Sequence, residues 1–390
     1  MKPGDVAMRG SGTAPAGRFP ARPIQVVGEA HFRVTGFELA TDLLRGARLR
    51  PGITGLADRE TAEWARYPVF RLFEDMILFV GPPRHSVIRS RLHSWFTPAA
   101  AGELQALIDR VCDRILATVR TTADVIDFAA TVAHVLPLEV ISELIGIPAP
   151  DRPKIAKRAD MVVQAMWHTV TEVNRANGAA VLLDRYFRQL IAARRAAPAA
   201  DLTSELVADG SLSDDEIIAS LVFLVIAATF TTGDFLTSAM VMAVRNQEFR
   251  RRVLDGNTVA ASVEEALRLH PPIAHIIRNA EERIELGSVV VPAGALIDVD
   301  VAAANRDPAQ FPRPDEFRPD RVPNRSLSFS LGAHYCCGWA LGRAEAETLL
   351  PKFLRAFPDI RLAGEPLPKR HPFQQGFQRV SLVLREADAR

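Results

Sequence analysis

The stretch from Asp214 to Val244 constrains the fold of this 390-residue chain more than any other. Three acidic residues open the stretch, where they suit the positive end of a helix dipole. A single helix of this length extends roughly 45 Å, whereas a compact chain of this size has a radius of gyration of about 21 Å. Its most apolar part, Ile217–Phe230, is shorter than the about 20 residues that span a membrane. We therefore predict a buried helix that crosses much of the core.

The rest of the chain predicts a mainly α fold with small β-sheets. An alternating pattern predicts a hairpin over Ile24–Thr35, and a short helix follows over Phe37–Leu44. From Ala99 to Pro198 the periodicity is helical and contains no strand pattern, with breaks near Thr121, Pro148 and Gly178. The charged stretches 151–158 and 185–195 are typical of solvated faces. Short strands and turns follow Pro272, and a last strand is predicted in GFQRVSLVL near the C-terminus.

The domain organisation follows from composition. Residues 1–22 are rich in Gly, Pro and Ala, and we interpret them as a disordered tail. No long linker, internal repeat or run of like charge divides residues 23–390, which we expect to form one domain.

Charge and cysteine content restrict the function classes. With 47 basic and 46 acidic residues, the net charge of +1 gives no reason to expect binding to nucleic acid or to a membrane surface. Three cysteines cannot form a disulfide framework, which indicates a reducing compartment and therefore a cytoplasmic location.

The segment that suggests chemistry is FSLGAHYCCG, Phe329–Gly338, followed at once by the helix-forming run WALGRAEAETLL. Cys336 lies just before this helix, whose start favours negative charge on a thiolate. Gly332 and Gly338 flank the cysteine, and glycine allows a sharp turn or the close approach of a flat ligand. One cysteine suits heme iron better than zinc or an iron–sulfur cluster, which need several ligands.

Two stretches before the long helix also bear on a site. Prolines bracket a helix over Pro82–Pro98 that carries His85 and Arg89 four residues apart, so that one face could grip a carboxylate. The segment Trp64–Gly81 is aromatic and apolar without a clean period. It could be a loop over a pocket or ordinary core.

The spacing of the cysteine segment resembles the heme-ligand signature of the cytochrome P450 superfamily, at Phe329, Gly332, His334, Cys336 and Gly338. The resemblance extends over nearly the whole chain from about Pro23 through four separated motifs. It implies the P450 fold with the long central helix over the heme. It also implies heme b with Cys336 as the axial thiolate, and a bystander role for Cys337.

Further roles come from the resemblance alone. It implies that His85, Arg89, Arg278 and His334 surround the heme propionates. Glu265, Arg268 and Arg321 match a structural ion network that supports the cysteine loop. Ile273, Ala274 and Ile276 match positions that often line the substrate pocket.

On the long helix the family pattern is Ala-Gly-x-acid-Thr-Thr, and the corresponding residues here are Ala227, Ala228, Thr229, Phe230, Thr231 and Thr232. The small Ala227 and Ala228 leave room beside a flat cofactor, and the hydroxyl of Thr231 suits the stabilisation of iron-bound oxygen. Phe230 replaces the acid that helps to relay protons. Asp234, one turn further on, could substitute for it, although a solvated or structural carboxylate is the simpler reading.

The resemblance therefore implies a monooxygenase that oxidises a small, largely apolar organic substrate, a natural-product intermediate by analogy, with O2. Electrons would come from a separate ferredoxin and ferredoxin reductase, for which Arg91 and Arg343 are candidate contacts. Phe230 leaves two alternatives open. One is an oxidase that couples, desaturates or rearranges its substrate without inserting oxygen, and the other is a heme-binding ligand binder without efficient turnover.

Overall fold

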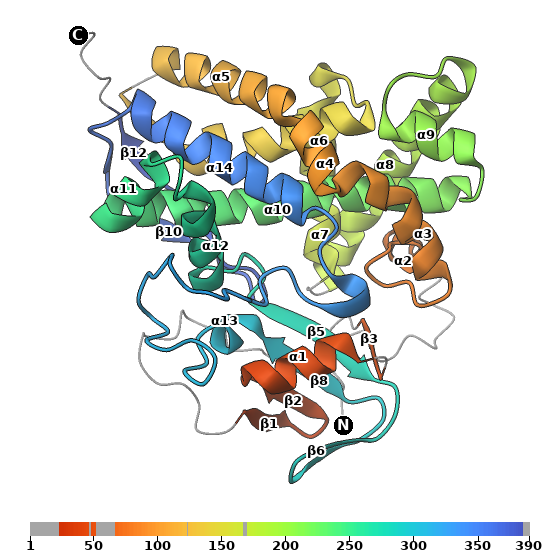
Figure 1. Cartoon of the computed structure of the whole chain (residues 1–390). Helices are drawn as coiled ribbons and strands as arrows, with labels where there is room; N and C mark the ends of the chain where they lie inside the picture. The colour runs from red at the N-terminus through yellow and green to blue at the C-terminus, as the bar shows by residue number, and fades with distance from the viewer. Residues whose placement is uncertain (1–22, 47, 52–66, 123, 167–169, 385–390) are drawn as a thin grey trace.

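The protein, seen here as a computed structural model, is described over residues 23–46, 48–51, 67–122, 124–166 and 170–384. The central helix α10 (Asp214–Arg245) crosses the molecule, with α14 (Trp339–Ala356) and α5 (Gln105–Thr122) on one side and a five-stranded sheet on the other (Figure 1). The predicted mainly α fold with small sheets is confirmed, and so is the long helix, which ends one residue later than predicted.

Local chemistry explains where α10 begins. Ser213 and Glu216 form a reciprocal capping box, in which each side chain bonds the other residue's backbone N–H. The three acidic residues of the first turn also form ion pairs with arginines of neighbouring helices. Glu216 pairs with Arg84 of α3 (Arg84–His93), while Asp214 and Asp215 pair with arginines of α8 (Val170–Ala196).

The middle of α10 is buried in the larger of two hydrophobic cores. Among the described residues, α10 is the one helix whose length and composition would also suit a membrane span, yet 61% of its most apolar window is buried inside the protein. Core helices of globular proteins share this property. The remaining helices are α1 (Phe37–Arg45), α2 (Pro68–Glu74), α4 (Pro98–Glu103), α6 (Val135–Ile145), α7 (Arg152–Ala165), α9 (Leu202–Asp209), α11 (Gln247–Leu254), α12 (Val259–Leu269) and α13 (Val301–Ala304).

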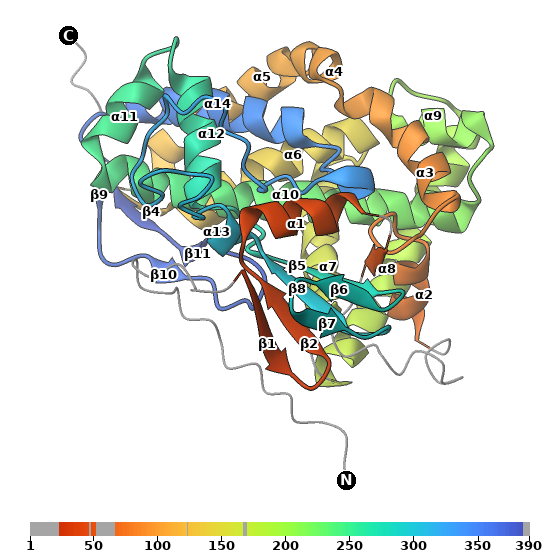
Figure 2. The same ribbon diagram turned by 60° about the horizontal axis from the view of Figure 1, so that its bottom comes forward.

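The second core belongs to the sheet, whose strand order is β1-β2-β8-β5-β3. The predicted hairpin forms β1 and β2, and α1 lies beside this sheet (Figure 2). β5 pairs antiparallel with β8, so that Arg278 stands opposite Ile297. The strands are β1 (Ile24–Gly28), β2 (His31–Val34), β3 (Leu49–Pro51), β4 (Val125–Asp127), β5 (His275–Ala280), β6 (Ile284–Leu286), β7 (Val289–Val291), β8 (Leu296–Asp300), β9 (Arg361–Leu362), β10 (Leu367–Pro368), β11 (Phe377–Arg379) and β12 (Ser381–Val383).

Three predictions for the region between Ala99 and Pro198 were wrong. β4 lies inside the stretch predicted to lack strands, because it pairs with β12 near the C-terminus, a partner that local periodicity cannot reveal. Gly178 does not interrupt α8, which continues through it while packing on α7 and α2. Arg152 is buried rather than solvated, since its guanidinium bonds Glu139 and the carbonyl of Ile147.

The predicted tail of residues 1–22 and the start of the Trp64–Gly81 segment lie outside the described residues. In the described part of that segment, both interpretations hold. Phe73 and Met76 are buried core residues, whereas Ile77 and Leu78 border a pocket. The prediction that residues 23–390 form one domain stays a prediction.

Candidate functional site

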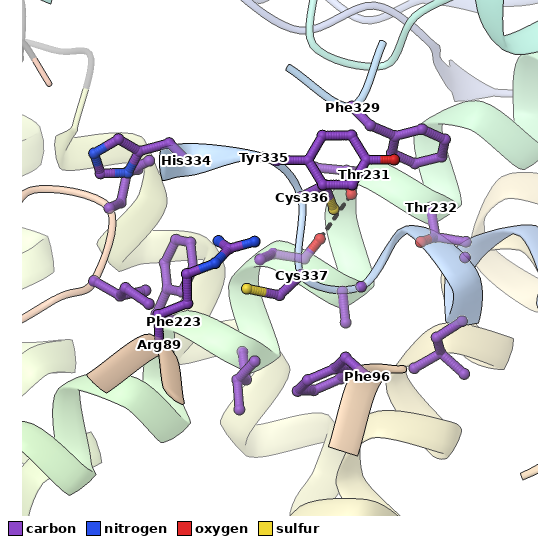
Figure 3. A pocket seen from close by; sticks show the side chains of 18 of the residues that line it. Arg89, Phe96, Phe223, Thr231, Thr232, Phe329, His334, Tyr335, Cys336 and Cys337 are labelled. Carbon is purple, nitrogen blue, oxygen red and sulfur yellow. Dashed lines mark hydrogen bonds between the residues drawn. The ribbon is translucent and has the colours of Figure 1, made fainter. Parts of the chain in front are cut away.

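A hollow of about 860 Å³, part of it open to solvent, lies between α10, α3 and the segment before α14 (Figure 3). Nine residues predicted for the site line it: His85, Arg89, Ala227, Ala228, Thr231, Phe329, His334, Cys336 and Gly338. The fold thus brings together three segments that are far apart in the sequence.

The segment that carries Cys336 is held by its own backbone and by α1. Gly332 has a φ of +71°, and a Cβ at this position would lie 2.5 Å from the carbonyl oxygen of Leu44. The N–H of Cys336 donates to the carbonyl of Phe329 at 2.9 Å, which closes the turn. At Gly338 a Cβ would meet no atom within 4 Å, so the absent side chain leaves space at the pocket wall.

The thiol of Cys336 faces the pocket, and its surroundings favour the protonated form. Cys336 is exposed to the open pocket, but the protein atoms crowded around its sulfur desolvate the thiolate and raise the pKa of Cys336 to about 11, while the N–H of Gly338 opposes the rise. The start of α14 is therefore not sufficient to make this thiol acidic. A cation bound directly to the sulfur deprotonates a thiol outright.

Cys337 also lines the pocket, and its sulfur points away from that of Cys336 toward Arg89 (Figure 3). Arg89 donates a hydrogen bond to the Cys337 thiol, while burial raises the pKa of this thiol above its usual value. The second cysteine thus has a contact of its own inside the cavity.

One end of the pocket concentrates groups that bind anions. The rings of His85 and His334 lie 4.4 Å apart between centroids. Arg89, one turn after His85 on α3, extends its guanidinium into the cavity toward Cys337 (Figure 3). Burial, together with the charges of Arg278, His85 and Arg89, lowers the pKa of His334 to about 3. Arg278 acts on His334 but does not line the hollow itself. It is buried, and burial lowers its pKa to about 10.

Two of these groups lack a satisfying partner. The buried Nε2 of His85 has no hydrogen-bond partner among the described residues. The guanidinium of Arg278 donates a hydrogen bond to the neighbouring carbonyl of Ile277. Among the described residues, no carboxylate pairs with it. A buried guanidinium without an anion is costly, so this end is suited to a ligand that carries carboxylates.

Part of the pocket wall is the small-residue face of α10. Ala227 and Ala228 lie on this face, and the Thr231 hydroxyl donates to the carbonyl of Ala227 at 2.7 Å (Figure 3). Since the hydroxyl proton is used within the helix, the lone pairs of Thr231 are available to accept a hydrogen bond from the pocket.

Phe230 does not line this pocket. Its ring is 6.4 Å from the ring of His134 and 5.9 Å from the ammonium nitrogen of Lys369. Asp234 is buried beside the same lysine, at 2.7 Å, so the solvated reading of its carboxylate was wrong. Phe230 and Asp234 belong to a different face of α10 from Thr231.

The three residues expected at the substrate pocket do not line the hollow around Cys336 either. Ala274 is buried, Ile273 forms an isolated bridge to Gln374, and Ile276 packs against the sheet core. Their assignment to a substrate pocket stays a prediction.

The sequence analysis missed several lining residues. Phe96, Phe223 and Tyr335 add aromatic surface to the pocket. Glu345 is 2% exposed, and burial raises the pKa of its carboxyl to about 8. The sequence contained an indication of this residue. Glu345 follows Leu341 by one turn on the apolar face of α14, where a carboxylate is unusual.

The acid and two arginines predicted as a network lie together beneath the cysteine segment. Arg268 binds both carboxylate oxygens of Glu265 at 2.8 Å, and both side chains are fully buried. Hydrogen bonds connect this network to the cysteine segment. Arg268 bonds the carbonyl of Asn305, whose side-chain amide donates to Ser328, and Ser328 donates to the carbonyl of Leu267. Ser328 immediately precedes Phe329.

Both candidate contacts for a redox partner are already bound by the chain itself. Arg91 donates to Ser211 and pairs with Asp209 at 3.1 Å. Arg343 pairs with Glu264 and stacks over the rings of Phe329 and Trp339, 5.2 and 4.8 Å from their centroids. A partner's carboxylate would have to compete with these contacts.

Comparison with known proteins identifies the family. The cytochrome P450 family model matches residues 257–377. Cytochrome P450 109 of Bacillus spizizenii is 33% identical over 329 residues, covering 80% of this chain and 80% of its own. The chain belongs to the cytochrome P450 family. It is therefore an oxidoreductase of the monooxygenase type, and its cofactor is heme b held by a cysteine thiolate.

Solved P450 structures agree with this fold. The P450BioI structure, in complex with an acyl carrier protein bearing hexadec-9Z-enoic acid, has a TM-score of 0.86 at 25% identity, covering 91% of this chain and 92% of that one. CxnD, a P450 for C–S bond formation in chuangxinmycin biosynthesis, has a TM-score of 0.82 at 25% identity, covering 94% and 92%. The predicted P450 fold is confirmed.

The pocket residues of this P450 fit heme b. Cys336 supplies a thiol in the pocket, and the missing side chain of Gly338 leaves room for a flat ring system. The Nε2 of His85, which lacks a partner among the described residues, suits a carboxylate of this cofactor. Arg278 lies outside the lining but adds positive charge near His334 at the same end.

Proposed function

We propose that this P450 oxidises a small, largely apolar organic substrate, a natural-product intermediate, with O2 and with electrons from a separate ferredoxin and ferredoxin reductase in the cytoplasm. The observation that carries the proposal is that Cys336 and Thr231, from distant segments, line one pocket whose end holds His85, Arg89 and His334. This arrangement offers an iron ligand, a hydrogen-bonding alcohol and a carboxylate-binding end in one cavity.

The residues have separate tasks in this proposal. Cys336 would hold the heme iron through its thiolate, and the N–H of Gly338 would stabilise negative charge on its sulfur. His85, Arg89, Arg278 and His334 would bind and orient the carboxylates of the cofactor. The bound heme supplies the activation of O2, to which a thiolate ligand contributes electron density.

On the α10 side, Ala227 and Ala228 keep the helix backbone close to the cavity. Thr231 accepts or donates a hydrogen bond where oxygen is activated, exchanging its bond to the Ala227 carbonyl. Glu265, Arg268 and Arg321 act on the chemistry only by holding the cysteine segment in place.

The substrate class follows from the lining of the hollow. Phe96, Phe223, Leu224 and Leu341 make much of its surface apolar, which suits a hydrophobic molecule with few polar anchors. The likeness to P450BioI and CxnD supports a natural-product setting, since the first is described with a carrier-bound fatty acid and the second for C–S bond formation in chuangxinmycin biosynthesis. Ile273, Ala274 and Ile276 complete the substrate pocket in this proposal.

Reconstitution tests the proposal. The heme-loaded protein, mixed with a ferredoxin, its reductase and NADPH, should consume O2 faster when a substrate that shifts the heme spectrum is added. Product from 18O2 should carry one labelled oxygen at a former C–H carbon. Substrate binding without substrate-dependent turnover would instead identify a ligand binder.

Phe230 favours a second candidate function. An aromatic side chain cannot carry a proton, and this one packs on His134 and Lys369 away from the pocket. Position 230 would then deliver no protons to the pocket, and the bound heme would supply an oxidation that ends in coupling, desaturation or rearrangement of the substrate. The same 18O2 experiment separates the two candidates, because this product would contain no labelled oxygen.

A further inference from the structure

Asp234 is a buried carboxylate on α10 that the proposed chemistry does not use. It is 1% exposed, and its Oδ2 accepts a hydrogen bond from the ammonium of Lys369 at 2.7 Å. His134 approaches the other oxygen, with 3.7 Å between Nε2 and Oδ1. A buried ion pair adds little to stability compared with well-packed apolar residues, and in some proteins it fixes one arrangement of the chain instead.

Phe230 and His134 pack closely around this ion pair. The Lys369 ammonium also lies over the ring of Phe230, an arrangement that favours a cation. His134 packs so closely on the central helix that a Cβ at Gly233 would lie 2.1 Å from its Nδ1. Burial raises the pKa of Asp234 to about 6, while the contact with Lys369 opposes the rise.

Lys369 begins the loop of residues 369–376, which joins β10 to β11 below α10 in Figure 2. Both ends of this loop rest on the central helix. A Cβ at Gly376 would lie 2.8 Å from the Cβ of Asp234, and the N–H of Lys369 bonds the carbonyl of Gly376 at 3.0 Å. The N–H of Phe377 bonds the hydroxyl of Thr237.

The middle of the loop holds the segment before β5. The N–H of Ala274 donates to the carbonyl of Phe373 at 2.7 Å, and the N–H of Gln375 donates to the carbonyl of Pro272 at 2.9 Å. Ile273 bridges Gln374 between these contacts. The loop therefore connects α10 directly to two residues of the proposed substrate pocket.

We propose that the ion pair between Asp234 and Lys369 is a positioning link, which fixes residues 369–376 and through them Ile273 and Ala274, and so sets the affinity for extended apolar ligands. This inference rests on the proposed function, because it assumes that Ile273 and Ala274 face the substrate. Asp234 and Lys369 are positioning residues rather than catalytic ones.

Two probes of the heme-loaded protein test the link. Imidazole binds the iron and is too small to reach distant walls, whereas 4-phenylimidazole also fills apolar space. Asp234→Asn and Lys369→Met should weaken 4-phenylimidazole binding about tenfold, which is about 1.4 kcal/mol, and leave imidazole binding unchanged. Binding is measured from the shift of the heme absorption band.

The matched control is Glu365→Gln. Glu365 pairs with Arg245 at 2.6 Å and so joins the last turn of α10 to the chain before β10, but this pair is exposed. Its loss should change the affinity for neither probe. The proposal would be overturned if Glu365→Gln weakened 4-phenylimidazole binding selectively and as much as Asp234→Asn does. It would also be overturned if Asp234→Asn weakened the binding of both probes equally.

A variant that leaves the charges intact covers the case in which Asp234→Asn does not fold. Gly376→Ala pushes the loop away from Asp234, and it should show the same selective loss of 4-phenylimidazole binding. Unchanged affinity for 4-phenylimidazole in this variant would contradict the link.

Hydrogen exchange separates this inference from the proposed function. In heme-free protein, residues 369–376 should exchange faster in Lys369→Met than in the parent, and unchanged exchange would overturn the link. The parent's carbon monoxide spectrum is the independent check: without the thiolate-type band the proposed function fails, even if the exchange result holds.

Discussion

Arg321 donates a hydrogen bond from Nε to Oε1 of Glu265 at 2.9 Å, and this contact joins the loop before the cysteine segment to helix α12. The same carboxylate also receives the guanidinium of Arg268, the N–H of Arg318 and the amide of Asn324. Although burial alone would raise the pKa of Glu265, these donors outweigh it and lower the pKa. The carboxylate is therefore held ionised inside the protein.

Glu265→Gln should destabilise the fold strongly. It removes the charge that compensates two arginines, and breaking a buried pair typically costs about 3–5 kcal/mol. Urea denaturation should show this loss, and heme content after purification should fall. The control is Glu248→Gln, which disrupts exposed pairs with Arg251 and Arg252 and should leave the urea midpoint close to that of the parent, because water screens exposed pairs. Equal losses in the two variants would contradict the network's structural role.

Cys336→Ser should abolish the thiolate-type carbon monoxide band of the reduced protein, because a serine oxygen cannot replace the sulfur ligand. Cys337→Ser is the matched control, since its side chain lies in the same pocket but contacts Arg89. It should keep the band. A normal spectrum in Cys336→Ser, or its loss in Cys337→Ser alone, would reverse the assignment of the ligand.

Two glycines of the same loop should behave differently when changed to alanine. Gly332→Ala forces a side chain at positive φ against the carbonyl of Leu44, so the free energy of unfolding should fall by about 1–3 kcal/mol even without heme. Gly338→Ala meets no protein atom within 4 Å. It should leave the heme-free protein as stable as the parent and reduce heme uptake. Urea denaturation and heme titration measure the two effects.

The buried pair of His275 and Asp298, 2.8 Å apart, should make stability depend on pH. Burial alone would lower the pKa of His275, but the hydrogen bond and charge of Asp298 outweigh it and raise this pKa above 6.5. Burial would raise the pKa of Asp298, but His275 and Arg33 lower it below 3.8. A raised histidine pKa stabilises the fold fully below pH 6.5, and this contribution is lost as pH rises through the folded pKa.

The pair's contribution should therefore be largest between about pH 4 and 6.5. Urea unfolding at pH 5.5, 7 and 8.5 should show that the free energy of unfolding of the parent exceeds that of His275→Asn by an amount that shrinks as pH rises. His93→Asn, at an exposed position, serves as the control and should not alter the pH profile. An advantage that grows with pH would contradict the raised pKa.

The sequence alone determined the central helix, the hairpin over β1 and β2, and the cysteine segment, because the signals for these features are local. Helical periodicity, the acidic first turn and the fixed spacing around Cys336 each lie within one short stretch. Through the resemblance, distant positions such as His85 and Arg321 could also be named. The resemblance also gave the expected partner of Arg321, whereas the contacts of Glu265 with Arg318 and Asn324 appear only in the fold.

Tertiary structure decided the features that depend on residues distant in sequence. Strand β4 exists because it pairs with β12, and Arg152 is buried because Glu139 and the Ile147 carbonyl satisfy it. In the sequence, Phe230 shows only that the acid of the family pattern is absent at this position. In the fold it lies away from the pocket, beside Lys369, which binds Asp234 and starts the loop that reaches Ala274. Periodicity reports which face of a helix is apolar, but only packing shows what that face meets.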